Sequence, residues 1–226
     1  MNRREFLKSS LFTAIGGMIL ASCQKAVIKS KKLLKGDEMK KILIVNASPR
    51  KNGNSDTICQ MLAKDLKDHE VTVFNMVEKK CNHCLACGAC QNKDTQMCVQ
   101  KDDISELLPV IDKCDAIVMA TPIYNQQVTA RAKLFIERWY PFFKYNGKLM
   151  SNTSKYSKKG AIICSFWGSP VENVTKYANW TLDGFSQIGV EDKKTLIFPQ
   201  IPNRGDVLKH EDYVKQIHDL SSWLVM

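Results

Sequence analysis

The run KILIVNASPRKNGNS, residues 41–55, is the most informative part of this sequence. Its four consecutive apolar residues, 42–45, predict a short buried strand, and a polar loop follows at once. Apolar residues at 58, 62 and 66 then recur with the spacing of a helix. A strand, a polar loop with a glycine and a helix start form a geometry that binds phosphate, because the helix N-terminus offers free N–H groups and the positive end of its dipole.

Side chains of this loop can add charge and hydrogen bonds to a bound phosphate. The candidates are Ser48, Arg50, Asn52, Asn54 and Ser55. The loop has neither the Gly-Lys-Ser/Thr ending of a P-loop nor a GxGxxG pattern, so a single phosphate monoester is favoured over a nucleoside triphosphate or a dinucleotide. The alternative interpretation is a surface loop between strand and helix that binds nothing.

Five apolar strand patterns alternate with five helical patterns between residue 41 and the end of the chain. The predicted strands are 42–45, 71–74, 116–120, 161–166 and 195–198, and the predicted helices are 55–68, 102–113, 129–140, 171–188 and 207–224. This alternation predicts a single α/β domain over residues 41–226, with a doubly wound, five-stranded parallel sheet covered on both faces. In such sheets, ligands bind beyond the carboxyl ends of the strands.

Two further loops leave the same predicted edge. One begins Thr121-Pro122-Ile123-Tyr124-Asn125, and the other reads Trp167-Gly168-Ser169-Pro170. Backbone amides of these loops can hold the edge of a planar heteroaromatic ring, and Tyr124 or Trp167 can cover its face. Each aromatic residue taken alone has a plainer interpretation as a packing residue; their shared position favours binding.

Five of the nine cysteines lie between residues 81 and 98, in the run CNHCLACGACQNKDTQMC. The segment is inserted between the second and third predicted strands. Thiolates separated by two residues can converge on one metal centre, and four of them satisfy a [4Fe–4S] cluster. The rival interpretations are a Cys₄ zinc site and, in an oxidising compartment, disulfides. One cysteine is surplus in every four-ligand arrangement.

The first forty residues have a different character. Residues 2–8, NRREFLK, have the form of a twin-arginine leader, and residues 9–22 are an uncharged, mostly apolar stretch too short to span a bilayer comfortably. Leu20-Ala21-Ser22-Cys23 resembles a bacterial lipobox. We therefore expect a signal peptide over 1–22, a lysine-rich tether over 23–40 with a lipidated Cys23, export by the twin-arginine route, and anchoring to the periplasmic or outer side of a membrane. In the alternative, Met39 starts a cytoplasmic protein.

The basic charge of the chain is concentrated in its beginning. The leader contributes +2 and residues 24–41 contribute +5 to a total of +10, so the predicted domain carries only +3. A nucleic-acid partner, which requires basic charge on the folded surface, is therefore not expected.

Several remaining residues have simple structural interpretations. Asp102 and Asp103 are expected to cap the helix that begins there. Cys59, Cys114 and Cys164 are expected to be small buried residues. The run Trp139-Tyr140-Pro141-Phe142-Phe143 is interpreted either as an exposed contact surface or as a helix end packed into the core.

Three motifs in this order resemble the flavodoxin-like, NADPH-dependent FMN reductase family, and its iron–sulfur flavoprotein branch in particular. They are NASPRKNGNS, the cysteine run ending CVQKDDI, and ATPIYNQQVTARAKLFIER. The resemblance covers about residues 40–225 and implies a flavodoxin-like fold that binds FMN. It places the five loop candidates named above on the phosphate, and Pro122, Ile123, Tyr124 and Asn125 along the isoalloxazine, with Trp167, Gly168 and Ser169 on the third side.

The same resemblance favours Cys84, Cys87, Cys90 and Cys98 as ligands of a [4Fe–4S] cluster, because Asp102-Asp103 closely follow Cys98 as in that branch. The other register is Cys81, Cys84 and Cys87 with Cys98, so the surplus thiol is Cys81 or Cys90. The expected function is an FMN-dependent oxidoreductase, tethered to the membrane, that passes electrons between FMN and the cluster.

Two other functions are kept open. One is an NAD(P)H-dependent FMN or quinone reductase whose cysteines are structural, and the other is a non-enzymatic, flavin-binding electron carrier or scaffold lipoprotein. No protein general acid or base is required, because the flavin performs the redox chemistry. A homo-oligomer is expected, since a neighbouring subunit can cover an exposed flavin.

Overall fold

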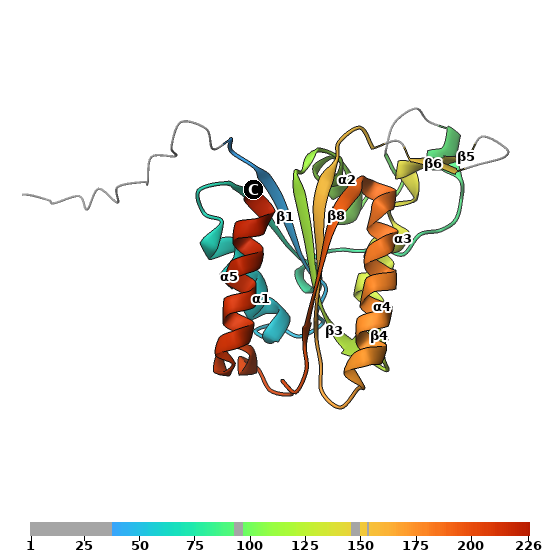
Figure 1. Ribbon diagram of the computed structural model, residues 1–226. Coiled ribbons are helices and arrows are strands. Elements are labelled where there is room, and N and C mark those ends of the chain that lie inside the picture. The colour runs from blue at the N-terminus through green and yellow to red at the C-terminus, as the bar shows by residue number, and fades with distance from the viewer. Residues whose placement is uncertain (1–37, 93–96, 146–149, 153) are drawn as a thin grey trace, which may run out of the picture. The chain divides into compact units, whose positions relative to one another are not determined.

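The computed structural model describes residues 38–92, 97–145, 150–152 and 154–226 (Figure 1). The leader, Cys23 and almost all of the tether lie outside the described residues, so the twin-arginine signal, the lipidation and the membrane anchor stay predictions. Within the described ranges, no helix is both long and apolar enough to cross a bilayer.

The sheet has five parallel strands in the order β2-β1-β3-β7-β8. This is the flavodoxin-like order, which confirms the predicted fold class. The parallel strands are β1 (Lys41–Asn46), β2 (Glu70–Asn75), β3 (Ala116–Tyr124), β7 (Lys158–Ser165) and β8 (Val190–Phe198). Three short strands were not predicted: β4 (Gln127–Val128), antiparallel to β3, and the antiparallel pair β5 (Phe143–Tyr145) and β6 (Met150–Asn152).

Five α-helices connect these strands, close to the predicted positions. They are α1 (Asn54–Asp65), α2 (Asp103–Lys113), α3 (Ala130–Glu137), α4 (Val171–Asp183) and α5 (Glu211–Val225). Short 3₁₀ helices account for most of the differences at the boundaries; they are η1 (Met76–Glu78), η2 (Ala89–Asn92), η3 (Tyr140–Phe142), η4 (Gly184–Ile188) and η5 (Asp206–Lys209).

Two hydrophobic cores lie on opposite faces of the sheet. Figure 1 shows α1 and α5 on one side and α3 and α4 on the other. On the first side, Ile58 and Leu62 of α1 and Leu220 of α5 pack against alternate residues of β1 and β3. The second core joins the remaining strand residues to α2, α3 and α4. Because both faces are covered, β1 and β3 are apolar at nearly every position rather than at every second one.

The aromatic run 139–143 belongs to the second core. Trp139 and Phe142 have no exposed surface, and the Trp139 ring meets Phe135 and Phe185 edge-on, at centroid distances of 5.4 and 4.8 Å. The interpretation of this run as an exposed contact surface is therefore wrong, and the helix-end interpretation holds. The run of apolar residues alone does not show which way its side chains point. Helix α3 ends at Glu137, and Trp139 and Phe142 in the turn that follows are buried.

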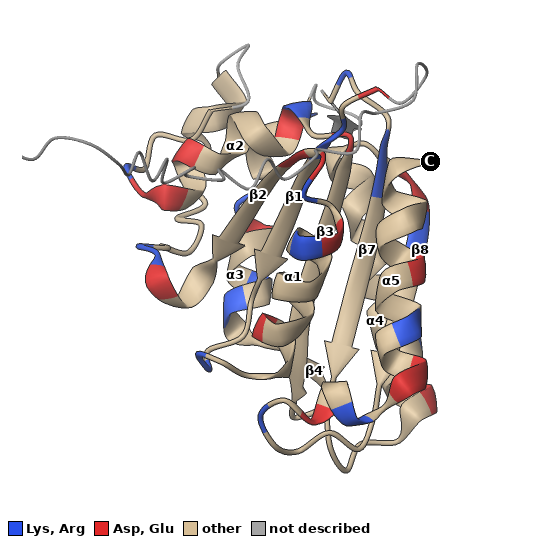
Figure 2. Ribbon diagram, turned by 90° about the vertical axis from the view of Figure 1, so that its left-hand side faces the viewer, with Lys and Arg blue, Asp and Glu red and all other residues tan. Residues whose placement is uncertain are grey.

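Charged residues of both signs are interspersed over the helices and strand ends in the view of Figure 2. Figure 2 also shows β2, β1 and β3 side by side in the sheet. The parallel register pairs Asn46 with Asn75 and with Ala120, so β1, β2 and β3 reach the carboxyl edge together. The loops after β1, β3, β7 and β8 leave from that edge.

Candidate functional site

A cavity of about 310 Å³ lies at the carboxyl edge of the sheet, a volume within the range of small-molecule sites. It is lined by the loops after β1, β7 and β8, by the start of α1, and by the last residues of β3 and β7. The lining residues are Ser48, Arg50, Gly53, Asn54, Ser55, Pro122, Ile123, Tyr124, Ser165, Phe166, Trp167, Ile201, Pro202, Asn203 and Arg204.

The N-terminus of α1 opens into this cavity with free backbone donors. Gly53 is the N-cap residue, and no side chain caps the helix. The first bond of the helix runs from Thr57 N to Gly53 O, so the N–H groups of residues 54–56 precede it and have no intrahelical acceptor. Because Gly53, Asn54 and Ser55 line the cavity, these donors and the positive end of the helix dipole favour an anion there.

The loop before α1 is held in shape by its own polar groups. Ser48 N donates to the side chain of Asn46, and Arg50 N donates to Ser48 Oγ, at 3.1 Å in each case. The Oγ atoms of Ser55 and Ser165 lie 3.5 Å apart inside the cavity. Ser48, Ser55 and Ser165 are buried, whereas Arg50 is exposed, so the hydroxyls lie within the site and the guanidinium can approach from its rim.

Asn54 joins the loop after β1 to the loop after β8. Its Nδ2 donates to Ile201 O and to Asn203 O, at 2.9 Å each, and its Oδ1 accepts from Val207 N at 3.2 Å. These three bonds occupy the side-chain amide, so Asn54 contributes to the cavity by fixing the walls and through its backbone N–H. The same contact brings Arg204, a second cation, to the phosphate end of the site.

The opposite end of the cavity is apolar and aromatic. Pro122, Ile123 and Phe166 line it, while Tyr124 and Trp167 are 40% and 65% exposed at its mouth. Flat, exposed aromatic side chains beside an apolar wall suit the face of a planar ring. The cavity therefore combines an anion site with a ring site.

Four of the residues proposed from the sequence do not line this cavity. Asn52 has a φ of 55° and its N–H donates to Asp56, so it turns the loop from outside. Asn125 and its neighbour Gln126 both have positive φ, as the two-residue turn between β3 and β4 requires. Gly168 and Ser169 line an adjacent hollow that shares Trp167 with the cavity.

Sequence reasoning missed the loop after β8 altogether. Ile201, Pro202, Asn203 and Arg204 contribute to the cavity from there, and Gly53, Ser165 and Phe166 were also missed. The signal was present: a run rich in Pro, Asn and Gly, residues 199–205, follows the last predicted strand at the same edge of the sheet.

A second cavity gathers four of the five clustered cysteines. Cys84, Cys87, Cys90 and Cys98 all line it, together with Leu85, Gly88, Val99, Gln100, Glu137, Arg138, Tyr140 and Pro141. Two nitrogen donors already reach these sulfurs: Ala86 N lies 3.4 Å from Cys84 Sγ, and Gln91 Nε2 lies 3.7 Å from Cys90 Sγ. We call this group of four thiols the cysteine pocket.

Cys81 stands apart from the cysteine pocket. It is half-buried, and burial together with Asp102 and Asp103 raises the pKa of its thiol to about 11. All eight cysteines among the described residues are free thiols. Cys59, Cys114 and Cys164 are buried as expected, and burial raises the pKa of each; the pKa of Cys114 and that of Cys164 reach about 12.

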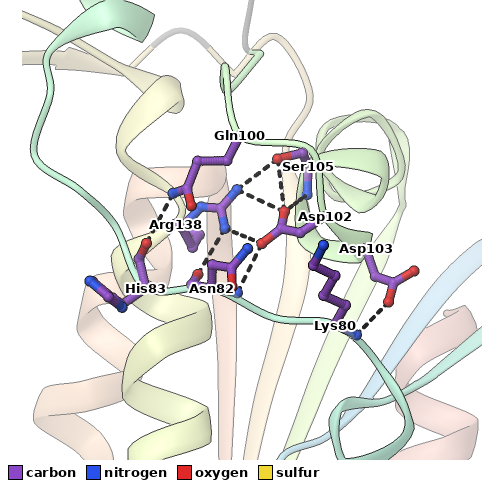
Figure 3. A network of polar contacts seen from close by, with 8 residues as sticks. All are labelled: Lys80, Asn82, His83, Gln100, Asp102, Asp103, Ser105 and Arg138. Carbon is purple, nitrogen blue, oxygen red and sulfur yellow. Dashed lines mark hydrogen bonds and ion pairs between the residues drawn. The ribbon is translucent and has the colours of Figure 1, made fainter.

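A buried ion pair borders the cysteine pocket (Figure 3). Arg138 donates to both carboxylate oxygens of Asp102, at 2.6 and 3.0 Å, and neither side chain has more than 1% of its surface exposed. Asp102 also caps α2, as predicted, by accepting from Ser105 N and Oγ. Burial alone would raise the pKa of Asp102, but the bonds from Arg138, Asn82 and Ser105 outweigh it and lower the pKa to about 2.

The ion pair also fixes both ends of the cysteine-rich segment. Asn82 N donates to Asp102 and Asn82 O accepts from Arg138, at 2.9 and 2.8 Å, which holds the segment two residues before Cys84. Asp102 itself holds the other end, four residues after Cys98. Gln100 reaches across to the carbonyl of His83 (Figure 3).

Four thiols that line one pocket are the set of donors that a [4Fe–4S] cluster takes. In the described ranges, no group of three or more His, Cys, Asp or Glu side chains is placed to hold a metal ion. A tetrahedral zinc requires thiolates about 4 Å apart, given Zn–S bonds of about 2.3 Å. Four irons at the corners of a cube are each bound by one thiolate, so a cluster accepts ligands more widely spaced around one pocket.

The two cavities are separate. Among the described residues they share no lining side chain, and α3 lies between them. Thr129, the N-cap of α3, donates to Ala47 O beside the loop after β1, whereas Arg138, just past the other end, lines the cysteine pocket. The eight residues of α3 span about 12 Å. The two cavities therefore lie near opposite ends of this helix.

Comparison with known proteins agrees with this geometry. Residues 40–169 match the family described as NADPH-dependent FMN reductase. An iron-sulfur flavoprotein from Archaeoglobus fulgidus is 34% identical over 145 residues, which make up 63% of this chain and 62% of that relative. An iron-sulfur flavoprotein from Clostridioides difficile is 26% identical over 163 residues, which make up 67% of this chain and 72% of that one. The match to the first relative thus covers less than two thirds of its length.

Solved structures show the same fold at low sequence identity. An FMN-dependent NADH-azoreductase from Bacillus anthracis superposes with a TM-score of 0.64 at 16% identity, covering 83% of this chain and all of that one. An NAD(P)H:quinone oxidoreductase from Methanothermobacter marburgensis gives a TM-score of 0.66 at 14% identity, covering 81% and 98%.

Proposed function

The chain belongs to the NADPH-dependent FMN reductase family, a family of flavin-dependent oxidoreductases, and from that premise we propose that it binds FMN at the carboxyl edge of the sheet and exchanges electrons with a [4Fe–4S] cluster in the cysteine pocket. The observation that carries the flavin half of the proposal is the uncapped N-terminus of α1 facing the same cavity as two exposed aromatic rings.

Each part of the cavity has a task in holding FMN. The backbone N–H groups at the start of α1 and the hydroxyls of Ser48 and Ser55 donate to the phosphate, and Arg50 and Arg204 supply positive charge. Backbone amides at the end of β3 hold the edge of the isoalloxazine, which the rings of Tyr124 and Trp167 cover in part. When bound, FMN supplies electron transfer in steps of one or two electrons.

The cluster half of the proposal rests on the four thiols that share one pocket. Cys84, Cys87, Cys90 and Cys98 would each bind one iron, and Cys81, which lies outside the pocket, would be the surplus thiol. When bound, the cluster supplies single-electron transfer. The chain's own contribution is to hold the four sulfurs around one pocket, with Cys90 buried, Cys84 and Cys98 partly buried and Cys87 exposed, and to donate hydrogen bonds to two of the sulfurs.

A second candidate function is an NAD(P)H-dependent FMN or quinone reductase in which the cysteines are structural. The exposure of Trp167 favours it, because the mouth of the cavity leaves room for a second flat molecule above the flavin. Turnover with NADPH or NADH in a steady-state assay supports this candidate, whereas reduction only by a protein or chemical donor supports the electron relay.

Placement on a membrane and assembly belong to the proposal as well. The leader and Cys23 would anchor the domain through a lysine-rich tether, and a second copy of the chain would cover the open side of the flavin. Membrane fractionation of Cys23→Ala, with native export as its control, tests the anchor. Sedimentation of the holoprotein tests the oligomer.

The deciding experiment is a visible spectrum of the full chain purified without oxygen, with iron, sulfide and zinc analysis. Flavin bands with a broad bleachable shoulder and about four irons per chain support the whole proposal. Flavin bands without iron leave the reductase candidate. A protein without flavin refutes both, and the non-enzymatic scaffold then becomes the better account.

A further inference from the structure

Arg138 is the one described cation that both lines the cysteine pocket and is buried. Its side chain is 1% exposed, so its charge is shielded very little by water. The other lining residue that carries a charge is Glu137, whose side chain is 40% exposed. Burying a guanidinium costs free energy unless its charge is paired and its N–H groups have acceptors.

The pairing of Arg138 is incomplete on one side only. Nη1 and Nη2 donate to Asp102, Asn82 O and Ser105 Oγ, all at 3.0 Å or less. The buried Nε, in contrast, has no hydrogen-bond partner among the described residues. An unsatisfied N–H of a charged group is expensive, so an acceptor is expected beside it.

Cys98 lines the same pocket as Arg138, and its sulfur is an acceptor that can serve the Nε–H. Asp102 does not line the cysteine pocket, so it lies behind Arg138 as seen from the thiols. The ion pair therefore presents its positive end to the pocket.

This arrangement suits an anionic centre more than four neutral thiols. Four thiolates on a [4Fe–4S] cluster leave a net negative charge, and one-electron reduction adds one more negative charge without releasing any ligand. A fixed positive charge that is itself buried stabilises the reduced form more than the oxidised form, and hydrogen bonds to the sulfurs act in the same direction.

We propose that Arg138 is the positioning and charge-compensating residue of the cysteine pocket: its Nε–H donates to the sulfur of Cys98 or of a bound cluster, Asp102 fixes its orientation, and its charge raises the reduction potential of the cluster. This inference rests on the proposed cluster. It goes further by assigning a role to a residue that binds no iron.

The test is an anaerobic redox titration of the full chain, followed by visible and EPR spectra, with iron counted in every sample. Arg138→Gln removes the charge, and Arg138→Lys keeps a charge but lacks the Nε–H. Lys215→Gln is the control, because it removes one charge from an exposed position on α5, which covers the other face of the sheet. The inference predicts at least a tenfold shift of the one-electron equilibrium toward the oxidised cluster in Arg138→Gln, which is 59 mV. Arg138→Lys falls between that variant and the wild type, and Lys215→Gln stays at the wild-type potential.

A purely structural clamp gives a different result. It predicts that the Arg138 variants bind less iron or unfold more easily, while the clusters that do form keep the wild-type potential; this outcome overturns the inference. If Arg138→Gln binds no iron, the reduction potential of the cluster in Arg138→Lys is compared with that of the wild type, and an unchanged potential overturns the inference. If the wild-type protein lacks iron, the proposed cluster itself is refuted. The flavin content of the same sample then tests the FMN half of the proposed function separately.

Discussion

Replacing Asp102 with Asn should destabilise the fold strongly, because it leaves the buried guanidinium of Arg138 without its counter-ion. Both side chains are essentially inaccessible to water, and the carboxylate accepts five hydrogen bonds, from Asn82 N, Ser105 N and Oγ, and two Arg138 nitrogens. An Asn amide would turn an NH₂ group toward one of these donors. Removing one partner of a buried ion pair costs about 3–5 kcal/mol.

The pH dependence of this loss has a definite sign. The pKa of Asp102 is lowered from 3.8 to about 2 in the folded chain, and each unit is worth about 1.4 kcal/mol, so ionised Asp102 contributes about 2 kcal/mol. A lowered folded-state pKa means that this stability is fully present above the unfolded pKa and is lost as the pH falls from about 5 toward 2. About 1 kcal/mol of it is gone at pH 3.

The assay is urea unfolding of the full chain, wild type and Asp102→Asn in parallel, at pH 7 and at several values down to pH 3, followed by far-UV circular dichroism. Asp219→Asn is the control, since its ion pair with Lys215 is exposed and worth less than about 1 kcal/mol. The reasoning is refuted by a difference below 1 kcal/mol at pH 7, or by a wild-type advantage that does not narrow as the solution is acidified.

Three further predictions concern the cavities and the backbone. Asn54→Ala removes three hydrogen bonds to the loop after β8 and should weaken FMN binding about tenfold or more, as measured by quenching of flavin fluorescence; unchanged affinity contradicts the role given to this residue. Cys98→Ser should lose iron while Cys81→Ser keeps it, and equal iron in both variants would show that the cysteine pocket is assigned wrongly. Gly189→Ala should cost at least about 1–3 kcal/mol in thermal or urea unfolding, because Gly189 has a φ of 88° and an added Cβ would collide with the backbone oxygen of Tyr156. A neutral effect would contradict this geometry.

Local patterns predicted the fold well because the three central strands, β1, β3 and β7, are buried on both sides. Residues 42–45 and 116–120 are apolar throughout. When such runs alternate with helical patterns along a chain, they are typical of strands in a parallel sheet that helices cover on both faces. The phosphate loop was also predictable, since its residues are contiguous. Asn52 and Asn125 are found in turns outside the cavity because a polar residue beside a site can serve either the ligand or the backbone, and sequence does not separate the two.

Long-range contacts account for what sequence reasoning missed. Arg204 reaches the cavity only because Asn54, about 150 residues earlier, holds the loop after β8 in place. From the sequence, Arg138 is interpreted as a surface charge at the end of a helix and Asp102 as a helix cap. In the fold, these two residues, 36 positions apart, form one buried ion pair that local patterns do not predict.

The clamp at Asn82 and Asp102 has a consequence for how the cysteine pocket is loaded. In an unfolded chain, bringing together the ends of a 20-residue loop costs about 2.7 kcal/mol of chain entropy beyond a constant. Here the folded domain has already met that cost, since both ends of the segment are fixed by side chains of α2 and α3. The proposed cluster would then find its ligands at a high effective concentration on a folded scaffold. Its insertion would be a local step that follows the folding of the sheet and does not drive it.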